Sequence, residues 1–356
     1  MKIIPPGSKI GIIGGGHLAR MIAQAAFTLG YKIRIFCPYV NSPASQLSNH
    51  VTLASYDDEK ALKEFAENVD IITFENEEVP NHLAKMLSQQ TTVMPRWNEL
   101  KIAYNRLKER QFLHSVGVPI SKFFSIDSKE KLEECYFKLN CQKAIYKALE
   151  LTPEGKSQVI LEGYKPDFDA IWNEINISEG ILEPFVEFEK ELSVIIARGY
   201  DTKYVMYDVS EYENKGQHFH SSIAPAYINC DTKNQAYEIA NIIASQLRLV
   251  GVLTVEFFML KDGSLLVNEI TPRPNETGYW TQDGCLTSHF EQLIRAICGL
   301  PLGAVNRYAS ISTSLLTAKE CQDFYTIMLS KTNNLYLYGK LDIPEDTIMG
   351  HVNTTL

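Results

Sequence analysis

The sequence has no apolar run approaching the ~18 residues that a membrane-spanning helix needs. Its first segment, Met1 to Lys9, contains two prolines and no apolar stretch of signal-peptide length. The 7 cysteines are odd in number, widely spaced and without a C-x-x-C pair, so neither a disulfide framework nor a zinc ribbon is expected. We therefore predict reduced thiols and a cytoplasmic protein with no membrane segment.

Runs of basic residues are also missing. The formal net charge is -9, and lysine and arginine are scattered along the chain. No nucleic-acid partner is therefore expected, because binding to a phosphate backbone requires a concentrated basic surface. An anionic ligand would need a local site.

What is present is the composition of an ordinary globular protein, with 45% hydrophobic residues in a chain of 356. This length predicts two or three packed units. Strand and helix signals alternate in the first hundred residues, which predicts βαβ units on a parallel sheet: Lys9 to Ile13, Leu18 to Leu29, Lys32 to Phe36 and Val69 to Phe74. One helix is expected over Leu100 to Val116, and a boundary near Asn105.

Short strands dominate the next part of the chain and predict an antiparallel sheet: Ala144 to Ala148, Gln158 to Glu162, Gly180 to Val186, Leu192 to Arg198 and Lys203 to Tyr207. A helix over Asn234 to Leu247 is expected to bury Ile239, Ile242, Ile243 and Leu247 on one face. The segment Gly299 to Gly303 is typical of a linker into a short tail.

A glycine-rich turn, Gly14-Gly15-Gly16-His17-Leu18-Ala19, follows the first strand and opens a helix. It satisfies the G-x-G-x-x-A pattern of dinucleotide-binding proteins, so an NAD-dependent oxidoreductase is one hypothesis. That pattern also needs an acidic residue at the end of the second strand, where this sequence has Cys37. The glycines can instead serve only a tight turn, or bind a phosphate that belongs to another ligand.

The segment Val252 to Ile270 carries two glutamates that a hairpin would bring together. Asp262-Gly263 between apolar runs predicts a two-residue type I′ loop, in which paired residue numbers add to the same sum and Glu256 lies opposite Glu269. Facing carboxylates repel unless a cation lies between them, and Mg²⁺ prefers one or two carboxylates plus phosphate and water oxygens. We predict a metal site at Glu256 and Glu269, with Asn268 as a further oxygen ligand. The alternative is that both glutamates point to solvent or pair with lysines.

Several motifs in order resemble the N5-carboxyaminoimidazole ribonucleotide synthetase family, ATP-grasp ligases of purine biosynthesis, over nearly the full length. They are Gly14 to Met21, Ser42 to Gln46, Thr73 to Glu77, Ala144 to Lys147, Glu183 to Ser193, Val267 to Pro274, and Trp280-Thr281 with Phe290-Glu291 and Arg295-Ala296. The resemblance implies an α/β and α+β architecture: an ATP-grasp fold with an N-terminal doubly wound, Rossmann-like domain and a small C-terminal extension. We place the N-terminal domain at 1–105, the ATP-grasp domain at 106–298 with a lid at about 106–180, and the C-terminal extension at 299–356.

The resemblance also implies the ligands: ATP, Mg²⁺, bicarbonate and aminoimidazole ribonucleotide, in an enzyme that is a homodimer. The nucleotide-binding set that it implies comprises Arg106, Lys147, Gly155, Lys156, Gln158, Glu183, Pro184, Phe185, Val186, Glu191, Asn214, Asn268 and Glu269. The implied ribonucleotide-binding set comprises Gly15, Gly16, His17, Leu18, Glu75, Asn76, Arg273, Asn275 and Glu276. Catalytic roles fall to Arg273, Lys156 and Glu154.

The sequence departs from the family pattern where that family handles anions. The lid loop Gly-Gly-Tyr-Asp-Gly-Lys-Gly is Leu151 to Ser157 here, His-Asn-Ser-Gly-His is Asn275 to Tyr279, and Arg-Lys before Met-Gly-His is Thr347-Ile348. A family histidine of the nucleotide region is Asn214. Each lost charged donor to a phosphate costs ~1.5 to 3 kcal/mol. Three outcomes stay open: the family reaction, an ATP-grasp ligase with a different acceptor, or a nucleotide-binding pseudoenzyme.

Overall fold

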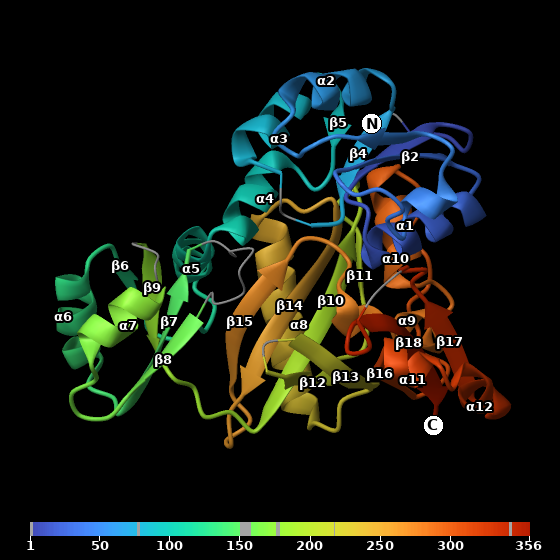
Figure 1. Cartoon of the computed structure of the whole chain (residues 1–356). Coiled ribbons are helices and arrows are strands. Elements are labelled where there is room, and N and C mark those ends of the chain that lie inside the picture. The colour runs from blue at the N-terminus through green and yellow to red at the C-terminus, as the bar shows by residue number, and fades with distance from the viewer. Residues whose placement is uncertain (1–2, 77–78, 150–157, 176–178, 217, 342–343) are drawn as a thin grey trace.

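The computed structural model describes residues 3–76, 79–149, 158–175, 179–216, 218–341 and 344–356. Three sheets organise the chain, each in its own region of Figure 1. None of the described helices combines the length and the apolar character that crossing a membrane requires.

A parallel sheet of five strands in the order β3-β2-β1-β4-β5 forms the N-terminal unit. This is the predicted doubly wound arrangement. Its strands are β1 Lys9–Ile13, β2 Lys32–Cys37, β3 Val51–Leu53, β4 Ile71–Phe74 and β5 Thr92–Val93. The helices are α1 His17–Thr28, η1 Ser45–Leu47, α2 Glu59–Glu67, α3 Asn81–Leu87 and α4 Trp97–Tyr104.

One helix was predicted over Leu100 to Val116, and this prediction is wrong. The chain forms α4 and then α5, Arg106–Ser115, with a break at Asn105. Asn105 has an extended backbone, and its side chain accepts a hydrogen bond from the Lys108 amide at 3.1 Å. An asparagine that caps a helix satisfies an otherwise unpaired amide, which explains why a new helix begins here.

A small antiparallel sheet in the order β6-β9-β7-β8 follows α5, on the left in Figure 1. Its elements are β6 Phe124–Ile126, α6 Lys129–Leu139, β7 Lys143–Ala148, β8 Gln158–Glu162, α7 Phe168–Ile175 and β9 Gly180–Pro184. Leu132, Tyr136, Tyr146, Leu161 and Leu182 belong to a core cluster made only of residues from this unit. We call it the small unit.

The third sheet has nine described strands in the order β15-β14-β10-β12-β13-β16-β18-β17, with β11 paired to β10. Its first elements are β10 Lys190–Arg198, β11 Tyr204–Met206, β12 Ser210–Lys215, β13 His218–Ala224, α8 Cys230–Gln246, β14 Gly251–Met259 and β15 Leu265–Thr271. They are followed by η2 Glu276–Gly278, α9 Thr281–Gly284, α10 His289–Ile297, β16 Ile311–Thr317, α11 Ala318–Cys321, α12 Phe324–Leu329, β17 Asn333–Leu337 and β18 Ile348–Thr355. The C-terminal strands therefore extend the same sheet.

Helix α8 corrects one part of the predicted core. Ile239, Ile243 and Leu247 are buried as predicted, but Ile242 is 41% exposed. The predicted apolar face was too wide, because Ile242 lies next to the buried stripe and not within it.

The N-terminal unit and the large sheet share one hydrophobic core. Met21 and Ala26 of α1 belong to the same cluster as Leu293 and Ile297 of α10. This contact places the glycine-rich turn that precedes α1 next to the segment that follows β15.

Candidate active site

Two facing glutamates lie on adjacent strands of the large sheet. Glu256 of β14 pairs with Glu269 of β15, as predicted, and the register shifts directly after that pair. Phe257 pairs with Val267, so Asn268 is an extra residue in β15, which is a β-bulge. Bulges are frequent next to active sites because they redirect side chains.

The predicted loop of this hairpin is wrong, although the predicted pair is right. Met259 pairs with Leu265, and Leu260 donates to the Ser264 carbonyl at 2.9 Å, so the loop has three residues, Lys261 to Gly263. Gly263 has φ +84°, which suits a three-residue loop with a left-handed glycine. The longer loop and the bulge at Asn268 each move the register by one residue in opposite senses, so their effects cancel at Glu256.

Glu256 is held by two neutral donors. Tyr212 Oη donates to its Oε2 at 2.9 Å, and Asn275 Nδ2 donates to its Oε1 at 3.0 Å. Burial and the nearby Glu269 carboxylate raise the pKa of Glu256 to about 8, against the lowering effect of the Tyr212 hydrogen bond. A divalent cation beside the pair would supply the missing positive charge, so these oxygen donors fit Mg²⁺.

Among the described residues, no group of three or more His, Cys, Asp or Glu side chains could hold a metal. The facing pair therefore offers two carboxylates, and Asn268 is the extra residue of the adjacent bulge. Such a site leaves coordination positions for phosphate oxygens and water, as Mg²⁺ sites in ATP-using enzymes do.

A buried charge network links the bulge to the small unit. Arg110 Nε lies 2.6 Å from Glu183 Oε1, and Arg110 Nη2 donates to the Asn268 carbonyl at 2.7 Å. Lys147 Nζ lies 3.0 Å from Glu183 Oε2. Burial alone would raise the pKa of Glu183, but the charges of Lys147 and Arg110 lower it to about 2.

Glu109, the neighbour of Arg110 on α5, also contacts the bulged strand. Its Oε1 accepts the Ile270 amide at 2.7 Å, and burial is the main reason why its pKa rises to about 7. The sequence analysis missed both Glu109 and Arg110. Adjacent charged residues in a short helix are usually exposed, and only the long-range contacts show that these are not.

The predicted nucleotide-binding residues lie on both sides of this network. Arg106 donates to the Ala148 carbonyl at 2.9 Å, and Gln158 pairs with Lys147 across β7 and β8. On the large sheet, Asn214 Nδ2 donates to Glu191 Oε1 at 3.1 Å, which brings two predicted residues together.

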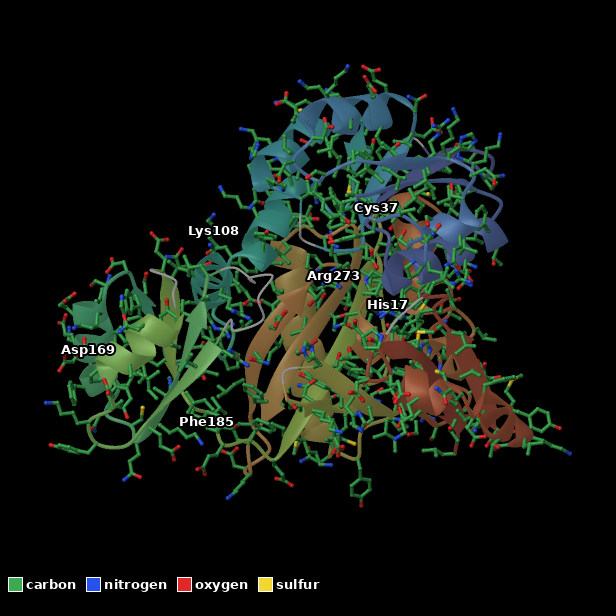
Figure 2. All side chains as sticks on the ribbon, in the orientation of Figure 1. His17, Cys37, Lys108, Asp169, Phe185 and Arg273 are labelled. Carbon is green, nitrogen blue, oxygen red and sulfur yellow. The ribbon has the colours of Figure 1, made fainter. Side chains whose placement is uncertain are left out.

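Four residues of the predicted nucleotide-binding set, Glu183 to Val186, lie at the end of β9 and just beyond it, and they differ in exposure. Glu183 is 2% exposed and turned toward its cations, whereas Pro184, Phe185 and Val186 are half-buried. Lys143 Nζ lies 4.4 Å from the centre of the Phe185 ring, which Figure 2 labels on the small unit. Glu183 therefore organises the strand through ion pairs, and its carboxylate is not directed at an open surface.

The predicted lid-loop residues Glu154, Gly155 and Lys156 lie outside the described residues. Their roles stay predictions.

The glycine-rich turn is closed by a carboxylate from the chain itself. Glu75, after β4, accepts the Gly16 amide at 2.6 Å and the Ala19 amide at 3.2 Å. Gly14 has φ +122°, and a β-carbon there would overlap Glu75 Cβ, so this position needs glycine; a β-carbon on Gly16 would displace the Glu75 carboxylate. Because a carboxylate already binds the amides that a dinucleotide phosphate would use, the turn does not fit the NAD hypothesis.

His17 and Glu276 meet where the N-terminal unit contacts the large sheet. His17 Nε2 lies 3.5 Å from Glu276 Oε1, and the two side chains are 25% and 32% exposed. Burial tends to raise the pKa of Glu276, but His17 and the Arg273 charge lower it to about 2. Figure 2 labels His17 and Arg273 in this junction.

The other predicted ribonucleotide-binding residues are mostly inside the protein. Leu18 is 5% exposed and packs in the shared core, so its side chain does not face a ligand. Asn275 is 5% exposed; besides Glu256 it contacts Thr254 Oγ1 at 3.2 Å and Thr277 Oγ1 at 2.9 Å. Asn275 therefore holds the Glu256 carboxylate in place.

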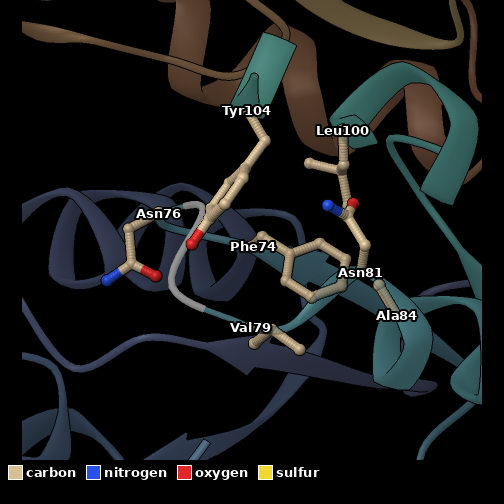
Figure 3. Close-up of a pocket in the computed structure, with 7 residues that line it drawn as sticks. All are labelled: Phe74, Asn76, Val79, Asn81, Ala84, Leu100 and Tyr104. Carbon is tan, nitrogen blue, oxygen red and sulfur yellow. The ribbon is translucent and has the colours of Figure 1, made fainter. Parts of the chain in front are cut away.

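Asn76 borders a cavity of about 10 Å³ between β4, α3 and α4. Figure 3 shows the Tyr104 hydroxyl directed toward the segment that carries Asn76, with Phe74, Val79 and Leu100 around the same space. Its volume is enough for about one water molecule, so the cavity is not itself a ribonucleotide site.

Two cations that the sequence analysis did not single out lie beside the glycine-rich turn. Arg20 donates to the Pro43 carbonyl at 2.8 Å and to Gln46 Oε1 at 3.1 Å. Lys340 donates to the Ile348 carbonyl at 2.7 Å, and burial lowers its pKa despite the nearby Glu75 charge. The Gln46 amide donates to the Gly339 carbonyl at 2.5 Å, which ties these two segments together.

Comparison with known proteins agrees with this arrangement. A family model described as the ribonucleotide synthetase preATP-grasp domain matches residues 8–104, and one described as the ATP-grasp domain matches residues 111–290. An N5-carboxyaminoimidazole ribonucleotide synthase of Brucella melitensis is 39% identical over 350 residues, which cover 98% of this chain and 96% of that protein.

A second curated protein and a solved structure are also similar to this chain over nearly its full length. A bifunctional purine synthesis protein purC/E of Dictyostelium discoideum is 37% identical over 98% of this chain, which spans 37% of that longer protein. The crystal structure of an ADP complex of N5-carboxyaminoimidazole ribonucleotide synthetase superposes with a TM-score of 0.95 at 36% identity, covering 100% of this chain and 94% of that one. By full-length identity and by fold, the chain belongs to the N5-carboxyaminoimidazole ribonucleotide synthase family of ATP-grasp ligases.

Proposed function

We propose that this enzyme uses ATP to carboxylate 5-aminoimidazole ribonucleotide with bicarbonate. ATP phosphorylates bicarbonate to carboxyphosphate, and the amine of the ribonucleotide takes the carboxyl group, either from carboxyphosphate or from CO₂ released by it. The products are N5-carboxyaminoimidazole ribonucleotide, ADP and phosphate. The observation that carries this proposal is the facing Glu256 and Glu269 pair, tied through Arg110 to the nucleotide side, in a chain of this family.

ATP would lie between the small unit and the large sheet. Arg106, Lys147 and the lid residues Gly155 and Lys156 would contact its phosphates, with Gln158 beside them. The strand end from Glu183 to Val186 would line the adenine pocket. Glu191, held by Asn214, would accept hydrogen bonds from the ribose hydroxyls.

Glu256, Glu269 and Asn268 would hold Mg²⁺. The bound cation would neutralise the nucleotide phosphates and the charge that develops in phosphoryl transfer. Arg110 and Glu109 would keep the bulged strand in place through the Asn268 carbonyl and the Ile270 amide.

The acceptor would bind where the glycine-rich turn meets the segment after β15. Arg273 would stabilise carboxyphosphate, with Lys156 and Glu154 of the lid completing the catalytic set. Gly15, Gly16, His17, Glu75 and Asn76 would line the ribonucleotide side. Thr347 and Ile348 carry no charge, so Lys340 and Arg20, which lie beside the turn, would bind the ribose phosphate.

The remaining parts of the proposal follow from family membership. We expect a cytoplasmic homodimer, built from an N-terminal domain at 1–105, an ATP-grasp domain at 106–298 and a C-terminal extension at 299–356.

Ligand-dependent thermal unfolding tests the nucleotide part. Mg-ATP or Mg-ADP should raise the melting temperature, because a ligand at a hundred times its Kd adds ~2.7 kcal/mol to the free energy of unfolding. NAD should not. Stabilisation by NAD alone would reverse the assignment.

Coupled ADP release tests the reaction. We expect bicarbonate-dependent ADP release that aminoimidazole ribonucleotide stimulates with a raised KM, because the missing cations bind substrate and not the transferred phosphoryl group.

A different acceptor is the second candidate. The observation that favours it is Glu276, a carboxylate that would repel an anion brought close to it, together with the uncharged Thr347 and Ile348. Normal ATP binding without ribonucleotide stimulation at millimolar concentrations would establish this candidate.

A further inference from the structure

The carboxylation that we propose must remove a proton from the acceptor amine. When the amine nitrogen attacks the carboxyl carbon, an N–C bond forms and the C–O bond to phosphate breaks, with its electron pair leaving on phosphate. The nitrogen then has one proton too many. A base within reach of the amine would accept it.

We infer that His17, oriented by Glu276, is this base. The inference rests on the proposed function, because it needs the acceptor amine at the junction of the glycine-rich turn and the Arg273 segment. His17 Nε2 lies 3.5 Å from Glu276 Oε1. In the neutral tautomer whose Nε2 proton is directed at that carboxylate, the lone pair is on Nδ1. Among the residues that the structure describes, none hydrogen-bonds to Nδ1.

Two contacts fix the orientation of the imidazole. The His17 ring stacks on Tyr338 with centroids 4.5 Å apart and planes at 15°. Tyr338 is itself fixed, because its hydroxyl lies 3.0 Å from His351 Nδ1. A ring held on one face by Tyr338 and at one nitrogen by Glu276 presents its other nitrogen in a defined direction.

The other potential bases of this region are either hydrogen-bonded to the backbone or buried. Glu75 accepts hydrogen bonds from two backbone amides, one at each carboxylate oxygen. His289 is fully buried, and burial lowers its pKa to about 3. His351 is fully buried between the rings of Tyr279 and Tyr336, at 4.1 and 4.6 Å. Of these three histidines, only His17 is partly exposed.

Several charged groups surround the His17–Glu276 pair. His17 is the first residue of α1, and its Nε2 lies 3.5 Å from Glu276 Oε1. The titratable and charged groups around the pair include Arg20 on α1, Glu75 after β4, Glu256 on β14, Arg273 before η2, Tyr279 after η2, His289 on α10, Tyr338 and Lys340 after β17, and His351 on β18. After transfer, the imidazolium and Glu276 form an ion pair.

The pH dependence of kcat and kcat/KM for the ribonucleotide tests the assignment. ADP release should be measured at saturating Mg-ATP, with bicarbonate ion held constant at each pH, for the wild type, His17→Gln, Glu276→Gln and His82→Gln. His82 is an exposed histidine on α3 and serves as the matched control.

The wild type should lose activity on the acid side as the base becomes protonated. His17→Gln should lower kcat by ~10² or more and abolish this acid limb. Glu276→Gln should move the limb to lower pH, because removing an anion lowers the pKa of the neighbouring imidazole. In His17→Ala, added imidazole should restore part of the activity. His82→Gln should match the wild type.

The assignment of His17 would be overturned if the ribonucleotide stimulates the wild type and His17→Gln keeps both the wild-type kcat and the acid limb. A rise in KM alone, which indicates a purely binding role, would also overturn it. A wild type that the ribonucleotide does not stimulate would instead overturn the proposed function, so the two failures are distinguishable. NMR titration of the His17 ring in the wild type and in Glu276→Gln gives an independent check: an unchanged pKa would show that Glu276 does not act on His17.

Discussion

The nucleotide side and the acceptor side of this enzyme are stabilised in different ways. On the nucleotide side, Arg110 and Glu183 are nearly fully buried and exchange charged hydrogen bonds with Lys147 and with the strand that carries Glu269. On the acceptor side, His351 lies between the rings of Tyr279 and Tyr336, and His17 stacks on Tyr338. Charges hold one side and aromatic rings hold much of the other.

This difference bears on one departure from the family pattern, at Tyr279. A buried ion pair fails when one partner is changed, because the other charge is left without compensation. A stack of rings tolerates replacement of one planar side chain by another. Tyr279, which stands where the family pattern has histidine, is fully buried and stacked on His351. A tyrosine ring therefore fits this place in the stack.

The largest effect is expected from breaking the metal pair. Glu269→Gln should lower ATP turnover by a factor of ~10³ or more, because one of two charged ligands is lost. The melting temperature should stay the same or rise, since repulsion with Glu256 is relieved. Steady-state ADP release and thermal unfolding measure both. Glu213→Gln, an exposed glutamate on β12, is the control, and full activity of Glu269→Gln would exclude the metal assignment.

The next effect concerns the buried charges. Arg110→Leu should lower the free energy of unfolding by roughly 3 to 5 kcal/mol, because Glu183 and the Asn268 carbonyl lose their partner inside the protein. Arg110→Lys should lose less, since it keeps the charge but not the forked geometry. Urea unfolding measures the difference. If Arg110→Leu has the same free energy of unfolding as the wild type, the buried charges do not stabilise the nucleotide side.

A smaller effect is expected from restoring cations on the acceptor side. Thr347→Arg with Ile348→Lys should lower KM for aminoimidazole ribonucleotide about tenfold or more, because each new donor to the ribose phosphate contributes ~1.5 kcal/mol or more. The KM for ATP should not change. Lys319→Ala with Lys331→Ala, two surface lysines of the same C-terminal region, controls for general charge effects. An unchanged KM would mean that the phosphate binds elsewhere.

The smallest effect concerns the seam between the N-terminal unit and the large sheet. Glu99 of α4 is 2% exposed, and burial raises its pKa to about 7 although Arg96 contacts it at 3.0 Å. Because the folded pKa exceeds the unfolded one, the unfolded state binds fewer protons above about pH 4.5. Stability therefore falls as pH rises through about 7.

In Glu99→Gln the loss of stability caused by ionisation of the buried Glu99 carboxyl is absent. The mutant should gain about 1 kcal/mol relative to the wild type between about pH 6 and about pH 7. Urea unfolding at a series of pH values measures the gain. A difference that does not depend on pH would show that Glu99 titrates normally in the folded protein.

Local sequence patterns predicted much of this molecule. Alternating strand and helix signals gave the parallel sheet, and the apolar runs around Asp262-Gly263 gave the pair of glutamates. The correct pair came from an incorrect loop, since the three-residue turn and the bulge at Asn268 compensate each other. An alternating pattern of apolar residues does not show where a bulge lies. The sequence therefore could not predict the three-residue loop or the bulge at Asn268.

Other parts could not be predicted because they depend on distant contacts. Glu109 and Arg110 are adjacent charged residues whose burial arises only when α5 packs on β9 and β15. Lys340 lies in a segment without periodicity, and its proximity to Glu75 joins residues from opposite ends of the chain. The family resemblance supplied the implied ligand set, but the position of Lys340 and Arg20 beside the glycine-rich turn depends on the folded chain.

The separate core of the small unit has a consequence for local unfolding. Its cluster around Tyr136 and Tyr146 shares no residue with the core that joins α1 to α10. Regions with independent cores open independently, so amide hydrogen exchange should divide the chain into two cooperative blocks. The amides of β7 and β9 would exchange at a lower opening free energy than those of β10 and β14. Bound nucleotide, in contact with both blocks, would bring their exchange rates together.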